Sequence, residues 1–145
     1  SAANYALQNK THLDEAAIWI DQALAQNKSF GTLIVKAGIL KESGKTAEAE
    51  KTRAEAVAVA TEAELNTYGY QFLASDPAKA VEIFKLMTQR FPKSANAWDS
   101  LGEGYVNTGD QKNAIASFKK ALGLNPPDNV KVNSEKYLKQ LGAMK

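Results

Sequence analysis

The feature that most constrains this 145-residue chain is a spaced pattern of large and small side chains within residues 95–128. The pattern reads Trp98-x-x-Leu101-Gly102-x-x-Tyr105, then Ala114-x-x-x-Phe118, Ala121 and Pro126. Spacings of three and four residues place each half of the pattern on one stripe of a helix. We predict two helices with facing stripes, in which small residues allow close approach and large ones fill the space beside them.

Turn-forming residues mark the ends of these two predicted helices. Gly109 and Asp110 form the connection between them, and Asp110 is the expected N-cap of the second helix. Pro126 follows the second helix and cannot continue it.

This pattern resembles the tetratricopeptide repeat, whose W-x₂-L-G-x₂-Y…A-x₃-F…P signature spans about 34 residues. The resemblance implies an all-α fold, a right-handed α-solenoid of helix-turn-helix pairs in which each repeat buries its apolar face on a neighbour. It also implies a non-catalytic protein–protein interaction module.

Self-comparison extends the repeat over a single domain of residues 1–145, with a partial repeat 1–28, repeats 29–61, 62–94 and 95–128, and a capping helix 129–142. The predicted helices are Ser1–Asn9, Leu13–Ala25, Ser29–Ser43, Thr46–Ala60, Glu62–Ala74, Pro77–Arg90, Ala95–Thr108, Gln111–Leu124 and Asn129–Leu141. Thr11 is read as the start signal of the second helix, and Asp76 with Pro77 as the start of the sixth. Arg53 stands where Phe84 and Phe118 stand, so repeat 29–61 should pack less tightly.

The two ends of the chain are expected to differ. In the capping helix we expect four apolar residues to face inward and three lysines outward: Val132, Tyr137, Leu138 and Leu141 against Lys131, Lys136 and Lys139. The N-terminus has no such polar-backed cap, so we predict a fragment of a longer protein with an upstream part covering that end.

Charge and composition exclude several classes of function. Lys and Arg number 18 against 16 Asp and Glu, a balance that argues against a nucleic-acid partner. No apolar run reaches the ~20 residues needed for a membrane span. The chain has no cysteine, which removes disulfides and thiolate metal sites, and we expect no cofactor.

Catalytic residues are not expected either. His12, the one histidine, stands in a predicted turn, and the neighbouring Asp14 and Glu15 suit the first turn of a helix. Glu48 and Glu50 lie on alternating helix faces. No nucleophile–base set converges, so we predict that the chain is not an enzyme.

A second resemblance concerns context. The stretches Ala3–Asn9 and Leu13–Ala16 resemble the repeat segment that follows a small β-rich domain in exported bacterial proteins of unknown function. The Trp98–Tyr105 run is similar to repeat tails behind serine-hydrolase domains of the β-lactamase type. Both resemblances imply an exported or periplasmic protein in which the repeats serve another domain.

The predicted partner site is the concave groove, which the first helix of each pair should line. The expected groove residues are Tyr5, Gln8, Asn9, Ile34, Gly38, Lys41, Asn66, Tyr70, Leu73, Asp99, Glu103 and Val106. Tyrosines with adaptable amides suit a protein or peptide partner, although a solvated wall could carry the same residues. Tetratricopeptide domains of chaperone adaptors hold a partner's C-terminal carboxylate with lysine, arginine and asparagine side chains at these positions. Here only Lys41 and Asn66 match such a clamp, and Asp99 and Glu103 would repel an acidic tail.

A second predicted surface is a docking edge of Leu7, Ile18 and Trp19. Trp19 occupies an outward position that other copies mostly leave polar, which indicates docking to an upstream catalytic or β-rich domain, or dimerisation. The alternative is that the first helix folds over this tryptophan.

Overall fold

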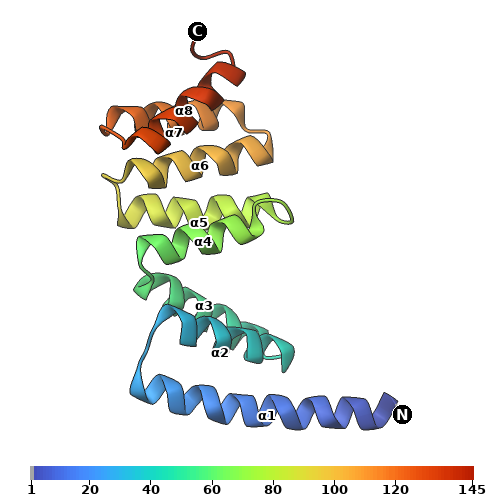
Figure 1. Ribbon diagram of the computed structural model, residues 1–145. Coiled ribbons are helices and arrows are strands. Elements are labelled where there is room, and N and C mark those ends of the chain that lie inside the picture. Colours follow the sequence, from blue (N-terminus) through green and yellow to red (C-terminus); the bar gives the residue numbers. More distant parts are fainter. Residues whose placement is uncertain (1) are drawn as a thin grey trace. The chain divides into compact units, whose positions relative to one another are not determined.

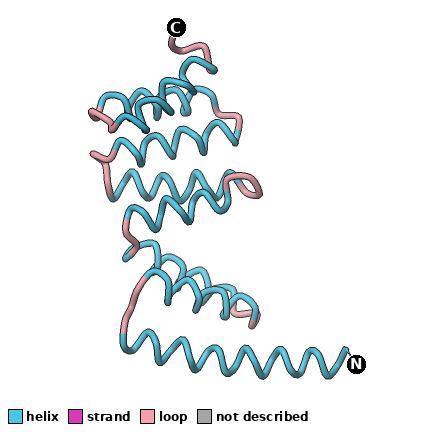
Figure 2. The backbone as a smooth tube through the Cα atoms, viewed as in Figure 1, coloured by secondary structure: helices cyan, strands magenta, loops and turns pink. Residues whose placement is uncertain are grey.

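The computed structural model describes the backbone of residues 2–145 and the side chains of residues 9, 10 and 12–145. The chain divides into two compact units, Ser1–Thr61 and Glu62–Lys145. The N-terminal unit contains α1 (Ala2–Gln26), α2 (Phe30–Glu42) and α3 (Thr46–Val59); the C-terminal unit contains α4 (Glu62–Phe72), α5 (Pro77–Arg90), α6 (Ala95–Thr108), α7 (Gln111–Gly123) and α8 (Asp128–Gln140) (Figure 1). Residues 2–145 include no strand, which confirms the all-α fold class (Figure 2).

Consecutive helices within each unit pack on one another. In the N-terminal unit α2 contacts both α1 and α3. In the C-terminal unit α6 contacts α5 and α7, and it also contacts α4 and α8. The first helices of successive pairs, α4, α6 and α8, therefore form a continuous row.

The N-terminal helix corrects the sequence-based prediction. Two helices, Ser1–Asn9 and Leu13–Ala25, were expected, with Thr11 starting the second one. Instead α1 runs without interruption from Ala2 to Gln26, and Thr11 lies inside it. The intervening Asn9, Lys10, Thr11 and His12 include neither glycine nor proline, so nothing in them forces the helix to end.

The other helices begin and end as the sequence predicts, within two residues. The side chains of Asp76 and Asp110 cap α5 and α7 by accepting hydrogen bonds from the backbone N–H groups of Lys79 and Asn113. Pro77 occupies the first turn of α5. Gly109 follows α6 in the left-handed region, at φ 79°, which lets the chain turn directly into α7.

Two phenylalanines packed against two glycines organise the C-terminal unit. Phe84 and Phe118 are fully buried. A Cβ added at Gly69 would lie 2.3 Å from Phe84 Cε1, and one added at Gly102 would lie 2.6 Å from Phe118 Cε1. Each ring therefore lies directly on the backbone of the preceding helix, where any larger residue would displace it.

The N-terminal unit replaces the same pair with Ala37 and Arg53. Ala37 is buried, whereas the side chain of Arg53 keeps 21 % of its surface exposed and pairs with Glu50. Arg53 therefore keeps part of its side chain exposed at a position where Phe84 and Phe118 are fully buried.

The last helix, α8, has a buried side and a charged outer side. Val130, Ser134 and Leu138 are buried, while Lys131, Lys136 and Lys139 are exposed as predicted. Val132 was expected to face inward, but it is 66 % exposed. Val130 takes the buried place, because it is spaced four residues from Ser134 and eight from Leu138.

Candidate peptide-binding face

The candidate site is the inner face of the C-terminal unit, which we define by the half-buried Asn66 and Tyr70 of α4, Glu103 of α6, and Asn133 and Tyr137 of α8. It also includes the buried Asp99, Ser100 and Ser134, which join these helices by hydrogen bonds. Asn66 Oδ1 accepts a hydrogen bond from Ser100 Oγ at 2.6 Å, which links α4 to α6. These two residues are 34 positions apart, the length of one repeat. Side-chain hydrogen bonds therefore join the first helices of successive repeats across the inner face.

Glu103 lies at the centre of this face between two tyrosines. The Tyr70 hydroxyl donates a hydrogen bond to Glu103 Oε2. Burial raises the pKa of the Glu103 carboxyl, while hydrogen bonds from Tyr137 and Asn133 and the charge of Lys136 oppose the rise. Burial and the negative charge of Glu103 raise the pKa of Tyr137 as well. The result is a half-buried carboxylate held mainly by neutral donors.

Both tyrosine rings are fixed by packing. Tyr70 meets Phe84 edge-on with ring centroids 5.1 Å apart, and Tyr137 stacks flat on Phe118 at 5.0 Å. The hydroxyl groups thus point at Glu103 from rigid supports, which fixes the position of the carboxylate.

Asp99 was predicted to be an accessible groove residue, but it is buried. It is only 5 % exposed, because α8 covers it: Ser134 Oγ donates to Oδ1 at 2.5 Å and Asn133 Nδ2 donates to Oδ2 at 2.9 Å. Burial raises the pKa of Asp99, and the hydrogen bonds from Ser134 and Asn133 oppose that rise. Asp99 therefore anchors α8 and is unable to meet a partner.

The remaining predicted groove residues have varied surroundings. Asn66, Tyr70, Leu73, Glu103 and Val106 are half-buried in the C-terminal unit, so they remain candidates. In the N-terminal unit Ile34 is half-buried, while Asn9, Gly38 and Lys41 are exposed. The side chains of Tyr5 and Gln8 lie outside the described residues.

Sequence reasoning missed Ser100, Asn133, Ser134 and Tyr137 as members of the inner face. Asn133 and Ser134 lie on a helix that was read as a polar-backed cap, so their inward contacts were not expected. The available signal was the spacing of 34 residues that separates Asp99 from Asn133 and Asn66 from Ser100.

The predicted docking edge is exposed where it is described. Ile18 is 61 % exposed and Trp19 is 80 % exposed on α1. The side chain of Leu7 lies outside the described residues. Neighbouring large apolar side chains that are this exposed are a feature of contact surfaces.

Other site types find little support in the described part of the chain. His12 is exposed on α1. Among the described residues no group of three or more His, Cys, Asp or Glu side chains is placed to hold a metal ion. None of the helices in the described residues combines the length and the apolar character needed to cross a membrane.

Comparison with known proteins agrees with this architecture. Residues 95–128 match the family profile described as "Tetratricopeptide repeat", which confirms the resemblance for that stretch. The chain is similar to Superkiller complex protein 3 of Mus musculus, with 33% identity over 72 residues that make up 50% of this chain and 5% of that protein. The Homo sapiens protein of the same name is 39% identical over 57 residues, or 39% of this chain and 4% of that protein.

A third relative carries the repeat in its name. Tetratricopeptide repeat protein 37 of Xenopus laevis is 34% identical over 64 residues, which cover 44% of this chain and 4% of that protein. The chain thus spans 4–5% of the length of the curated relatives it matches.

Proposed function

We propose that this chain is a non-catalytic protein-interaction module whose C-terminal unit binds an extended peptide segment of a partner along its inner face. The observation that carries the proposal is Glu103, a half-buried carboxylate flanked by the hydroxyl groups of Tyr70 and Tyr137. The tetratricopeptide match of residues 95–128, which contain Glu103, supports this use of the face.

The charge of Glu103 defines the partner further. Within the described residues, Glu103 forms no ion pair with a lysine or arginine. A partly desolvated carboxylate gains most from a cation that also donates hydrogen bonds, and a guanidinium does both. The face therefore suits a segment with a lysine or, better, an arginine, and it disfavours an acidic tail.

A selection experiment with a matched control tests this proposal. Peptides enriched from a displayed random library on the intact chain should carry a basic residue. Glu103→Gln should weaken their binding roughly tenfold, measured by calorimetry. Glu82→Gln, which neutralises an exposed carboxylate on α5, should leave the affinity unchanged.

Tyr70 provides a second arm of the same experiment. Tyr70→Ala is expected to weaken binding, but it also removes the edge-on contact with Phe84 and should reduce stability. Tyr70→Phe keeps the ring and removes the hydrogen bond to Glu103, so it separates binding from packing. Enrichment of acidic peptides, or equal affinity for wild type and Glu103→Gln, would refute the proposed site.

A second candidate function is favoured by the exposure of Ile18 and Trp19. In this alternative the chain is an accessory segment, and α1 docks on another domain of the same protein or on a second copy. Burying an indole of this size is worth on the order of 2–3 kcal/mol, which makes Trp19 a plausible anchor.

A further inference from the structure

The N-terminal unit contains a pocket of about 360 Å³ where α1, α2 and α3 meet. Its apolar wall is formed by Leu24 and Ala25 of α1 and by Leu33 of α2, and Leu33 is only 2 % exposed. Thr52 of α3 is also part of the lining. Pockets that bind small molecules measure about 300–1,000 Å³, so this one has room for a single large side chain.

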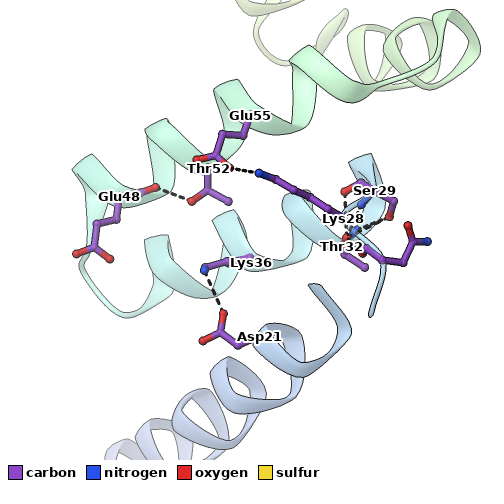
Figure 3. Close-up of polar contacts among 9 residues, drawn as sticks. Asp21, Lys28, Ser29, Thr32, Lys36, Glu48, Thr52 and Glu55 are labelled. Carbon is purple, nitrogen blue, oxygen red and sulfur yellow. Dashed lines mark hydrogen bonds and ion pairs between the residues drawn. The ribbon is translucent and has the colours of Figure 1, made fainter. Parts of the chain in front are cut away.

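Four of the residues that line this pocket form two ion pairs, which Figure 3 draws as dashed lines. Lys36 Nζ lies 3.0 Å from Asp21 Oδ1 and joins α2 to α1. Lys28 Nζ lies 3.3 Å from Glu55 Oε2 and joins the α1–α2 connection to α3. The rim thus offers two ammonium groups and two carboxylates around an apolar floor.

The C-terminal unit shows what fills the equivalent place in the last repeat. Ser29 and Ser94 cap α2 and α6 in the same way, and this alignment places Leu33 at the position of Trp98. The helices that follow agree with it, because the hydroxyls of Thr52 and Ser117 both donate at 2.8 Å to the carbonyl four residues earlier.

In that last repeat the corresponding position carries an indole. Trp98 Nε1 donates to the carbonyl oxygen of Pro92 at 2.9 Å, and Lys120 Nζ lies 5.8 Å from the centre of the Trp98 ring. The alignment places Glu55 at the position of Lys120. Repeat 29–61 therefore has the shorter Leu33 where the last repeat has its tryptophan.

We propose that the pocket of the N-terminal unit binds the tryptophan side chain of a partner polypeptide. The indole would rest on Leu33 in the space that Trp98 fills within its own repeat. The carboxylates of Asp21 and Glu55 can accept a hydrogen bond from the indole N–H. The carbonyl oxygen of Pro92 accepts the corresponding bond from Trp98 in the C-terminal unit.

The rim matches an aromatic side chain better than an aliphatic one. An aromatic ring is negative on its faces and positive at its edge, so ammonium groups favour the faces and carboxylates favour the edge and the N–H. Lys28 and Lys36 line the pocket together with Asp21 and Glu55, which provides both kinds of contact. A leucine side chain would make only the apolar contacts with Leu24, Ala25 and Leu33.

Titration of the whole chain with N-acetyl-tryptophanamide, followed by amide NMR shifts, tests the proposal. We expect saturable shifts at Leu33, Thr52 and Glu55 with a Kd on the order of 1 mM, and no saturation with N-acetyl-leucinamide. Leu33→Trp fills the pocket with the chain's own indole, so it should abolish the binding and raise the melting temperature. Glu82→Gln, which neutralises an exposed carboxylate of the C-terminal unit, should bind as wild type does.

The reverse substitution provides an independent arm. Trp98→Leu should open an equivalent space in the C-terminal unit and add a second saturable site near Ser117 and Lys120. Absence of saturation in the wild type, binding that persists in Leu33→Trp, or a folded Trp98→Leu variant without a second site would each overturn the proposal.

Discussion

Individual side chains show how one repeat pattern gives unequal packing. Phe118 lies against Gly102, and Phe84 against Gly69, in contacts that leave no room for a Cβ. The corresponding positions carry Ala37 and Arg53, and Arg53 keeps part of its side chain exposed. The same backbone position thus carries a buried ring in one unit and a partly solvated stem in the other.

Substituting alanine at these positions should separate the two cases. Phe118→Ala should lower the free energy of unfolding by ~3–5 kcal/mol, because it removes a fully buried ring from a close-packed site. Arg53→Ala should cost clearly less, since only the stem is lost. Urea denaturation measures both, and equal losses would contradict the equivalence of the two positions.

Asp99 makes the stability of the C-terminal unit depend on pH. Its pKa is raised above 3.8 in the folded chain, so the folded state holds the proton more tightly than the unfolded state. The free energy of unfolding must then fall as the pH rises through the interval between the unfolded and folded pKa values.

Asp99→Asn should remove this contribution without releasing α8. Asn66 already accepts a serine hydroxyl in the equivalent contact of α4 with α6, so a neutral amide fits such a place. The variant should gain stability relative to wild type as pH increases from about 4 to neutral, in urea denaturation at several pH values. A constant difference between the two proteins across that range would argue against the buried charge.

How far the site could be predicted depends on what covers each residue. Tyr70 and Glu103 were placed on one face by repeat spacing alone, and they do contact each other. Asp99 shares that face, yet its burial depends on Asn133 and Ser134, polar residues that give no apolar signal in the sequence. Periodicity finds a face, but it does not reveal a polar helix packed over part of it.

At the scale of elements, the bounds of α2 to α8 were predicted within two residues, whereas those of α1 were not. Helix ends are visible where Asp76, Asp110 or Gly109 stands. Between residues 9 and 13 the only signal is Thr11, and a threonine can lie inside a helix at a modest cost of about 0.7 kcal/mol or less relative to alanine. The prediction failed because one weak cap does not outweigh continuous helix propagation.

The exposed side of α1 leads to a prediction at this scale. Trp19→Glu should reduce dimerisation or domain docking through α1, because a charge replaces the exposed indole. Sedimentation of the chain tests dimerisation, and limited proteolysis of the full-length protein tests docking. Tyr105 and Phe118 should remain packed in this variant.

Unchanged behaviour of Trp19→Glu in both measurements would leave Trp19 as a solvated ring. The proposal for the inner face of the C-terminal unit would be unaffected by that outcome.

At the scale of the whole molecule, the two units bury different kinds of side chain. Among the described residues, the largest fully buried side chains all belong to the C-terminal unit: Phe84, Phe118, Leu65, Ile83, Met87, Leu138, Ser100 and Ser134. The N-terminal unit buries mostly alanines around Ile20 and Leu33. Less apolar area is therefore removed from water there.

This difference predicts unequal local stability. Amide hydrogens of α2 and α3 should exchange with solvent roughly tenfold or more faster than those of α5, α6 and α7, since one fewer buried ring already amounts to more than ~1.4 kcal/mol. Native-state hydrogen exchange resolved by residue measures this directly. Equal protection of the two units would show that small-residue packing compensates fully.

The charged outer side of α8 limits how copies of this chain can assemble. In the repeat register, Glu135, Lys136 and Lys139 occupy the positions that Leu101, Gly102 and Tyr105 hold on α6. A helix pair packed on this side would place a phenylalanine ring against Lys136, where Phe118 packs on the bare backbone of Gly102. It would also desolvate the three charged side chains. Head-to-tail polymerisation through α8 is therefore disfavoured, and any fibre-forming contact would have to use another surface.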